Sequence, residues 1–554
     1  MIECLEAMYG AETAVRVGDR VRGLLGEWAP RLAAASARRD RLLLSERDAL
    51  LISYPDQVQE AGEPPLRTLS AFGTRHLKGL VSGIHLLPFY PWSSDDGFSV
   101  KDYLTVEPRY GTWEDLALLS GDFDLMFDAV FNHASVQGAW FEGYLAGEAA
   151  YRDFFIEVTG EPDLSAVVRP RALPLLTEFP TAAGPRKLWT TFSADQADLN
   201  YGNPEVLLRV LDALLFYVAH GARYIRLDAI AFLWKTIGTP CVHLPQTHRF
   251  VRLLRVVLDA VAPWVLLVTE TNVPHADNIA YFGDGSNEAH LVYNFALPPL
   301  VLHSLATGSA ATLTRWARSL EIPSDRVAFL NFLASHDGIG LNPGRGILSE
   351  PEVGALVEQT IRHGGLVSWK QNPDGTRSPY ELNITWFDAV NDPASREPLG
   401  IQVDRFMVSQ AAMLALRGVP GVYFHSLVGS RNDRVAAESS GIPRRINRQK
   451  FQRDLLEREL AEPDSLRARV FGRFRALLRA RVASAAFDPR GRQEVVIGDP
   501  RLFTVVRTSP DGAQAAICHH NLSGDTVGVD DAGAGHVRLG PFEAGWWVNG
   551  ERCV

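Results

Sequence analysis

The chain has 554 residues, of which 46% are hydrophobic and 22% are charged. This composition is that of a globular protein and excludes a disordered chain. A single core stops growing at roughly 250 to 300 residues, so we expect one large domain with one or two smaller ones. The net charge of −10 argues against nucleic acid as a partner, because phosphate backbones bind basic surfaces.

Neither a membrane segment nor a metal framework is indicated. The first residues lack an apolar segment that follows basic residues, and no later run reaches membrane-spanning length. We therefore expect a cytoplasmic protein without a membrane partner. No cysteine belongs to a C-x-x-C pair, which is typical of reduced thiols and not of a zinc site or a disulfide framework: Cys4, Cys241, Cys518 and Cys553.

The predicted elements begin with an N-terminal helical extension, residues 1–46, in which two helices are expected because Leu, Val and Ala recur at helical spacing. A repeated pattern of apolar strand, polar loop and helix follows. The apolar runs are near-continuous, as in parallel strands covered by helices, and eight strands are predicted: Ala49–Tyr54, Val81–Phe89, Leu125–Asn132, Ala222–Asp228, Trp264–Thr269, Leu291–Phe295, Val327–Ala334 and Val419–Phe424. Eight such units indicate an α/β protein with a (β/α)8 TIM barrel, whose chemistry is expected at the carboxyl ends of the strands. The barrel is assigned to residues 47–133, 204–337 and 401–482.

Three further segments complete the predicted organisation. Residues 134–203, after the third strand, are rich in Phe, Tyr and Pro and predict an inserted subdomain. Residues 338–400 form a long loop or subdomain after the seventh strand, and long structured loops are commonly lids or substrate walls. In residues 485–554 the hydrophobic pattern alternates between Gly, Pro and Asp turns, which predicts a carboxyl-terminal all-β domain, a β-sandwich.

Polar residues stand at the ends of four predicted strands: Asp128-Ala-Val-Phe-Asn-His133, Arg226-Leu-Asp228, Thr269-Glu-Thr-Asn272 and Ser335-His-Asp337. Side chains two residues apart share one face of a strand, so Arg226 lies beside Asp228 and keeps it ionised, as a nucleophilic aspartate requires. Taken alone, this pair is equally well a structural ion pair. The order and placement of all four segments together favour a catalytic site.

The four segments resemble the motif regions of the α-amylase-type glycoside hydrolase clan, glycoside hydrolase family 13. The resemblance covers about residues 48 to 554 and implies the same barrel with an inserted domain and a carboxyl-terminal β domain. It implies a nucleophile, a general acid/base and a carboxylate that stabilises the transition state, in this order: Asp228, Glu270 and Asp337. The residues that hold the nucleophile and the sugar hydroxyls match Arg226, His133 and His336. A catalytically idle, amylase-like interaction protein is the alternative, but it would be expected to have lost one of the three acids.

The chemistry of these residues is consistent with that resemblance. A retaining mechanism needs two carboxyl groups about 5 to 5.5 Å apart, and Asp228 and Glu270 could lie so on adjacent strands. Glu270 must be protonated in the first step and ionised in the second, so burial and neighbouring acids should raise its pKa towards the working pH. His133 and His336 could instead be buried structural histidines.

A narrower resemblance is to the sucrose phosphorylase group. It is carried by His85-Leu-Leu-Pro-Phe-Tyr-Pro-Trp-Ser-Ser-Asp-Asp-Gly-Phe98, Ile225-Arg-Leu-Asp-Ala229, Phe295-Ala-Leu-Pro-Pro299, His336-Asp-Gly-Ile-Gly340 and Ile446-Asn-Arg448. It implies that Asp95 and Arg448 hold glucose hydroxyls at the closed end of a pocket for one glucose. Phe98 would be its aromatic platform, with plain core packing as the alternative.

The acceptor side must hold phosphate with cations and donors that water does not need. Arg171 and Tyr380 match loop residues that bind phosphate or acceptor in this group, and Arg169 lies nearby; an exposed basic loop is the alternative. The chain departs from sucrose phosphorylases at three positions, where Tyr, His and Gln are replaced by Phe232, Asn272 and Glu381. These departures indicate a rebuilt acceptor site.

Four features are most similar to those of glucosylglycerate phosphorylases: the extra amino-terminal helices, Arg-Pro-Arg-Ala-Leu-Pro174, Trp189-Thr-Thr-Phe-Ser193 with Asp195-Gln-Ala-Asp-Leu-Asn200, and Val242-His-Leu-Pro-Gln-Thr-His248. The resemblance implies a retaining α-glucoside phosphorylase that converts 2-O-α-glucosylglycerate and phosphate to α-glucose 1-phosphate and glycerate. Sucrose, sucrose 6-phosphate and glucosylglycerol phosphorylases are the nearest alternatives, followed by an α-glucosidase.

The same resemblance implies small molecules as the only partners, with inorganic phosphate as co-substrate and no metal or organic cofactor. Related amylases bind calcium at the position of Asn132, but this group generally does without it. The expected assembly is a monomer or a homodimer.

Overall fold

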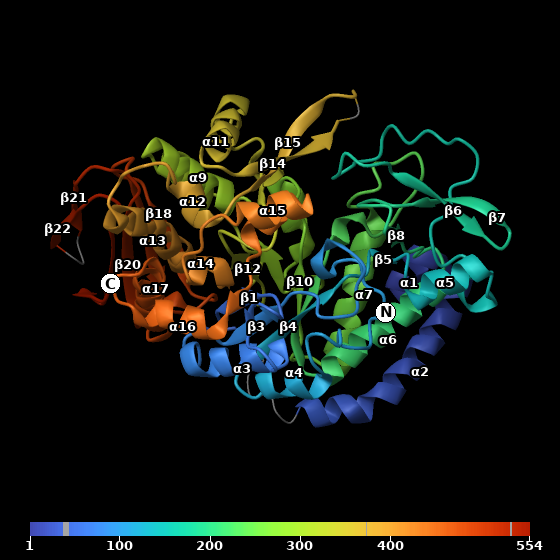
Figure 1. Ribbon diagram of the computed structural model, residues 1–554. Helices are drawn as coiled ribbons and strands as arrows, with labels where there is room; N and C mark the ends of the chain where they lie inside the picture. The colour runs from blue at the N-terminus through green and yellow to red at the C-terminus, as the bar shows by residue number, and fades with distance from the viewer. Residues whose placement is uncertain (37–43, 373, 532–534) are drawn as a thin grey trace.

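The computed structural model describes residues 1–36, 44–372, 374–531 and 535–554. Eight parallel strands close into a barrel near the centre of the molecule (Figure 1). Each overlaps one of the eight predicted strands, and around the barrel they follow the order β1 (Leu50–Ser53), β16 (Val419–Tyr423), β12 (Ala328–Asn331), β11 (Leu291–Tyr293), β10 (Leu266–Thr269), β9 (Ala222–Leu227), β4 (Asp124–Ala129) and β3 (Gly83–Leu86). The predicted α/β class and (β/α)8 barrel are confirmed.

Successive side chains of the barrel strands point alternately into the barrel and towards the surrounding helices, which gives two apolar layers. Tyr224 belongs to a cluster that takes most of its residues from the barrel strands and fills the barrel interior. Ile225 and Leu227 instead pack in the larger core between the strands and the helices. Because side chains two residues apart share a face, Arg226 and Asp228 extend the interior row of Tyr224 towards the carboxyl end of β9.

Helices surround the barrel on its outer side (Figure 1). One of them is α6 (Pro204–Ala219), which begins where the Asn203 side chain accepts a hydrogen bond from the Glu205 N–H at 3.0 Å. The other helices of the ring are α3 (Pro65–His76), α4 (Trp113–Leu119), α7 (Pro245–Val261), α9 (Leu297–Thr307), α10 (Ala311–Arg318), α13 (Leu399–Ala415) and α17 (Leu466–Val482). Within the described part of the chain, no helix combines the length and the apolar character needed to cross a bilayer.

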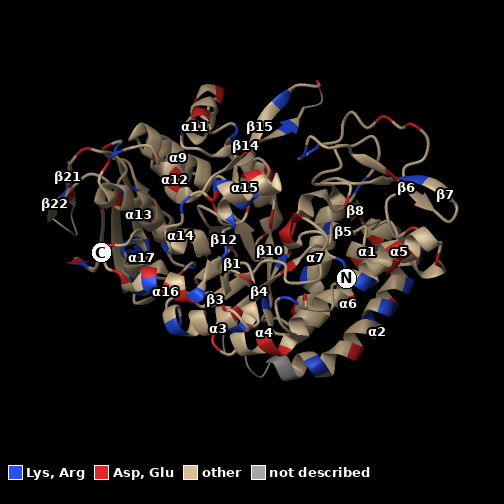
Figure 2. Ribbon diagram, in the orientation of Figure 1, with Lys and Arg blue, Asp and Glu red and all other residues tan. Residues whose placement is uncertain are grey.

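The two helices expected in residues 1–46 are α1 (Ile2–Tyr9) and α2 (Ala11–Ser36). Figure 2 shows basic and acidic residues interspersed along α2. One of them, Arg20, forms an ion pair with Glu205 of α6, and the Trp28 indole N–H donates to Asp212 of the same helix at 2.8 Å. The amino-terminal helices therefore pack on the outside of the barrel.

Two segments rise on one side of the barrel (Figure 1). After β4 come β5 (His133–Ser135), α5 (Ala139–Ala146), the hairpin β6 (Leu176–Thr181) and β7 (Gly184–Trp189), and β8 (Gln196–Asp198). After β12 come β13 (Ile339–Gly340), α11 (Glu350–Arg362) and the antiparallel pair β14 (Leu366–Gln371) and β15 (Arg377–Asn383). The boundaries 134–203 and 338–400 stay predictions.

The carboxyl-terminal region is antiparallel. Its five-stranded sheet has the order β18 (Arg492–Val496), β19 (Leu502–Thr508), β20 (Ala515–Asn521), β23 (Ala544–Val548) and β24 (Glu551–Arg552). A two-stranded ribbon, β21 (Val527–Asp531) and β22 (Gly535–Leu539), contributes Val527, Val537 and Leu539 to a cluster with Leu502 and Trp547 of the sheet. The predicted all-β character is confirmed.

Candidate active site

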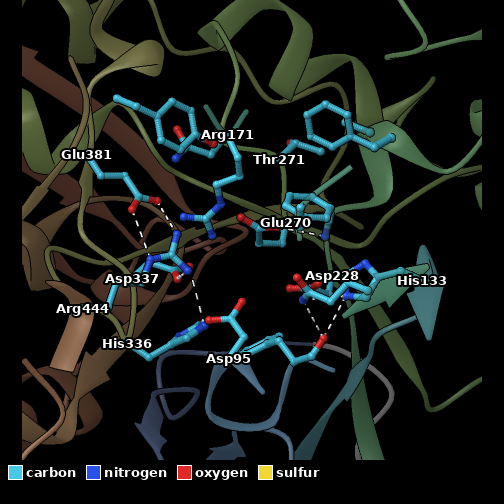
Figure 3. A pocket seen from close by; sticks show the side chains of 18 residues that line it. Asp95, His133, Arg171, Asp228, Glu270, Thr271, His336, Asp337, Glu381 and Arg444 are labelled. Carbon is cyan, nitrogen blue, oxygen red and sulfur yellow. Dashed lines mark hydrogen bonds and ion pairs between the residues drawn. The ribbon is translucent and has the colours of Figure 1, made fainter. Parts of the chain in front are cut away.

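A cavity opens at the carboxyl ends of the barrel strands (Figure 3). It holds about 630 Å³ of empty space, counting its open mouth. Most of the residues that the sequence singled out line it: Asp95, Phe98, His133, Arg171, Asp228, Glu270, His336, Asp337, Tyr380 and Glu381. The remaining wall includes Phe192, Gln196, Phe232, Thr271, Asn272 and Arg444.

The arginine that precedes Asp228 by two positions lies beneath the cavity floor. Arg226 is buried, and its Nη1 donates to Asp228 Oδ1 at 2.9 Å and also to Asp128. Asp128 takes a second hydrogen bond from His85 Nε2 at 2.8 Å. Because two carboxylates hold the guanidinium, Asp228 has a fixed cationic neighbour on the side away from the cavity.

Glu270 stands at the end of β10, beside β9, and its Oε2 accepts the backbone N–H of Ala229 at 3.0 Å. Burial raises the pKa of Glu270 to about 7; Arg226 opposes this rise, and the charges of Asp228 and Asp337 add to it. Burial also raises the pKa of Asp228 above its usual value, against the opposing charge of Arg226. The cavity therefore holds one carboxyl group that can exchange a proton near neutral pH.

On the opposite wall, Arg444 joins two carboxylates (Figure 3). Its guanidinium lies 2.6 Å from Asp337 Oδ1 and donates to both oxygens of Glu381, at 2.5 and 3.1 Å. Burial would raise the pKa of Asp337, but the nearby positive charges, of which Arg444 is the strongest, together outweigh it and lower that pKa well below the usual range. Asp337 is therefore ionised, beside a Glu270 that titrates near neutral pH.

The aromatic wall consists of Phe98 and His336, whose rings stack with centroids 4.8 Å apart and planes 5° from parallel. The Phe98 carbonyl accepts hydrogen bonds from His133 Nε2 at 2.8 Å and from the Gln196 amide at 3.0 Å. Burial lowers the pKa of His336 well below its usual value, so this ring is neutral at pH 7. Asp95 enters the cavity from the turn that precedes Phe98 (Figure 3).

Besides Arg226, two other arginines that the sequence predicted to bind substrate do not line the cavity. Arg448 is buried, forms an ion pair with Asp96 at 2.7 Å, and donates its Nε hydrogen to the His336 carbonyl at 2.9 Å. Arg169 donates to the carbonyl of Leu173 in its own loop. Arg171, two residues along the same loop, does extend into the cavity (Figure 3) and forms no ion pair within the described residues.

Sequence reasoning did not single out Arg444, Gln196, Phe192 and Thr271. Arg444 lies two positions before the Ile446-Asn-Arg448 segment, in a basic run with Arg445 and Arg448. The sequence does not indicate which of the three arginines faces the cavity. Gln196 and Phe192 lie within the insert, in segments that carry only the family resemblance and no assigned role. No local pattern distinguishes these residues from solvated ones.

A lysine side chain lies beside Asn132, the position at which related amylases bind calcium. Lys235 Nζ donates to Asn132 Oδ1 at 2.9 Å and forms an ion pair with Asp198, which is fully buried. Asp198 also accepts hydrogen bonds from the N–H and hydroxyl of Thr191 at 2.8 and 2.7 Å. The described residues contain no group of three or more His, Cys, Asp or Glu side chains placed to bind a metal. The ammonium group of Lys235 supplies the positive charge at this position.

Comparisons with known proteins agree with this geometry. Residues 75–338 match the alpha amylase catalytic domain family. The chain is 49% identical to a glucosylglycerate phosphorylase from Allomeiothermus silvanus over 96% of both chains. It is 44% identical to a glucosylglycerate phosphorylase from Escherichia coli K12 over 98% of both. The chain belongs to the glucosylglycerate phosphorylase family.

Members of the glucosylglycerate phosphorylase family are glycosyltransferases by reaction type, and this chain is therefore an enzyme of that type on an α-amylase barrel. Among solved structures, sucrose 6F-phosphate phosphorylase from Thermoanaerobacter thermosaccharolyticum superimposes with a TM-score of 0.77, covering 90% of this chain and 100% of the other. Its sequence identity is 22%, so it supports the fold alone.

Proposed function

We propose that this enzyme converts 2-O-α-glucosylglycerate and inorganic phosphate to α-glucose 1-phosphate and glycerate with retention of configuration. The observation that carries the proposal is one cavity lined by Asp228, Glu270 and Asp337, in which the pKa of Glu270 is about 7. The family supplies the donor and acceptor, since the relatives named above are glucosylglycerate phosphorylases.

In the proposed first step, an Oδ atom of Asp228 attacks the anomeric carbon while the bond to the glycerate oxygen breaks. Glu270 donates its proton to that oxygen, so glycerate leaves with a neutral hydroxyl group and a glucosyl ester of Asp228 remains. Burial supports this role, because it keeps a fraction of Glu270 protonated at pH 7. Arg226, held by Asp128, keeps Asp228 aimed at the cavity.

In the second step, a phosphate oxygen attacks the same carbon and the ester bond to Asp228 breaks. Glu270, now ionised, accepts the proton of the attacking phosphate hydroxyl. The enzyme is then back in its starting form, with Glu270 protonated and Asp228 free. Both steps develop positive charge on the sugar ring. The ionised Asp337 stands in the cavity to stabilise that charge, and Arg444 keeps it ionised.

The glucosyl unit is proposed to occupy the part of the cavity formed by Asp95, Phe98, His133 and His336. A stacked aromatic pair offers a flat apolar face to a sugar ring, and the polar side chains offer partners to its hydroxyls. In this proposal Arg448 acts from outside the cavity, through the His336 carbonyl that it binds.

The acceptor side is proposed to rely on Arg171 and Tyr380. Arg171 brings a cavity guanidinium without a carboxylate partner among the described residues, which suits both phosphate and the carboxylate of glycerate. Arg444 is already neutralised by Asp337 and Glu381, so Glu381 acts on the acceptor site through Arg444. Arg169 would have to leave the Leu173 carbonyl to join them.

The test is to incubate the protein with phosphate and, separately, glucosylglycerate, sucrose, sucrose 6-phosphate and glucosylglycerol, and to measure glucose 1-phosphate and free glucose. Release of glucose 1-phosphate from glucosylglycerate above the other donors is expected. Release mainly from another donor would mean that the acceptor is the alcohol part of that donor and not glycerate. Free glucose that forms equally without phosphate would mean an α-glucosidase, and no turnover of any donor would mean a catalytically idle protein.

Several expectations accompany the proposal. The reaction uses phosphate as co-substrate and, by its chemistry, calls for no metal or organic cofactor. Small molecules are the expected partners, and a cytoplasmic location and a monomeric or homodimeric state remain predictions from the sequence.

A further inference from the structure

The turn that carries Asp95 into the cavity has an unusual backbone. Asp95, Asp96 and Gly97 have φ angles of 54°, 48° and 117°, all in the left-handed region. L-residues with a Cβ disfavour this region, and two consecutive examples without glycine require support from the surrounding structure. Gly97 has no alternative, because a Cβ there would lie 2.9 Å from the Pro88 carbonyl oxygen.

The support comes from Asp96, whose carboxylate faces away from the active-site cavity. Its Oδ2 lies 2.7 Å from Arg448 Nη1, and its Oδ1 lies 2.7 Å from Arg445 Nη2. Burial alone would raise the pKa of Asp96, but the hydrogen bonds from Arg445 and Arg448 bring it to about 2. These three residues line a second cavity, separate from the one that holds Asp228.

The same ion pairs connect loops from three barrel strands. Asp96 follows β3, Arg448 follows β16, and the Arg448 Nε hydrogen bonds the carbonyl of His336, which follows β12. His336 in turn stacks on Phe98, two residues after Asp96. Contacts therefore link Asp96 to Arg448, Arg448 to His336 and His336 to Phe98, and the backbone from Asp96 to Phe98 completes the ring. The same turn carries Asp95 and Phe98, which line the active-site cavity.

We propose that Asp96 is a positioning residue for the glucosyl side of the cavity: its ion pairs with Arg448 and Arg445 hold the left-handed turn that directs Asp95 and Phe98 at the sugar. This inference rests on the proposed function, which places the glucosyl unit there. Asp96 itself touches no substrate.

Two substitutions separate its charge from its backbone conformation. Asp96→Asn removes the charge but keeps the size of the side chain, and asparagine also tolerates a positive φ. Asp96→Gly removes the charge and relieves the backbone at once. Asp56→Asn is the matched control, because Asp56 lines the same second cavity and pairs with Lys450 at 2.5 Å without belonging to the turn.

The assay uses α-glucosyl fluoride, which loads the glucosyl unit without glycerate, followed by a mixture of phosphate and glycerate. For both Asp96 variants we expect kcat/KM for the fluoride to fall about tenfold or more, through a higher KM, since small displacements at a reacting centre have effects of this size. The partition of the glucosyl-enzyme between phosphate and glycerate should stay within about twofold of wild type, because Asp96 pairs with Arg445 and Arg448 and not with Arg171. Asp56→Asn should match wild type in both measurements.

Burst titration of active sites and thermal unfolding of each variant guard against a general folding defect. If a variant loses activity only because fewer of its molecules are active, with KM unchanged, the inference is overturned. Wild-type kinetics in Asp96→Asn would also overturn it. Full activity in Asp96→Gly would show that the ion pairs only compensate strain and position nothing. A wild-type protein that forms no glucose 1-phosphate would overturn the proposed function and this inference with it, whereas an active wild type and an equally active Asp96→Asn would overturn the inference alone.

Discussion

The raised pKa of Glu270 predicts how the first half of the reaction depends on pH. Burial moves this pKa from an ordinary 4.5 to about 7, which corresponds to a difference of about 3 kcal/mol between the two protonation states in the cavity. Cleavage of the bond to glycerate needs the protonated form. The rate of glucosylation should therefore be high below pH 7 and be lost as the pH rises through that value.

The magnitude follows from the titration curve. One unit below a pKa of about 7 roughly nine-tenths of Glu270 carries the proton, and one unit above it roughly one-tenth does. The kcat/KM for glucosylglycerate should fall about tenfold between pH 6 and pH 8. In a double displacement this ratio contains the steps up to the glucosyl-enzyme only, so the ionisation of phosphate does not enter it.

The assay is the initial rate of glucose 1-phosphate formation against glucosylglycerate concentration at several pH values. α-Glucosyl fluoride is the control donor, since fluoride leaves without a proton and its kcat/KM should stay level between pH 6 and pH 8. Glu270→Gln should lose most activity on glucosylglycerate and lose the alkaline fall, yet still form glucosyl-enzyme from the fluoride. A kcat/KM for glucosylglycerate that is constant between pH 6 and pH 8, or an equal fall with both donors, would refute Glu270 as the acid.

Three other predictions concern single side chains. Asp228→Asn should lower phosphorolysis at least about a thousandfold, measured as glucose 1-phosphate release in a variant of unchanged thermal stability; near-normal turnover would remove Asp228 as the nucleophile. Arg171→Ala should raise the KM for phosphate about tenfold or more, because hydrogen bonds to a charged group are worth about 1.5–3 kcal/mol. Hydrolysis of α-glucosyl fluoride by the same variant should change little, and an unaltered phosphate KM would place the anion elsewhere. Lys235→Met should lower the free energy of unfolding by about 3–5 kcal/mol, because it leaves the carboxylate of Asp198 buried without its cation. Urea unfolding measures this loss, and a stability equal to that of wild type would mean that the cation of Lys235 is dispensable.

The barrel and the acids at its rim could be predicted from the sequence because both depend on local patterns. A near-continuous apolar run predicts a strand buried on both faces, and the two-residue period of a strand then fixes that Arg226 and Asp228 face the same way. Parallel strands present their carboxyl ends at one rim, so the residues that follow eight strands had to meet there. Glu270 and Asp337 required nothing more, and the cavity contains both.

Side chains on the loops above the rim were decided by the tertiary structure. Three arginines stand close together at Arg444, Arg445 and Arg448, and the sequence favoured the last for the sugar; the short helix η6 (Pro443–Asn447) instead turns Arg444 to Asp337 and leaves Arg448 with Asp96. The direction of a loop side chain depends on its contacts with residues that follow other strands. The sequence pattern of its own segment gives no information about those contacts. For the same reason the sequence by itself determined the fold and the meeting of the three acids at one rim, while contacts between distant loops alone decided which cations border the cavity and which hold its wall in place.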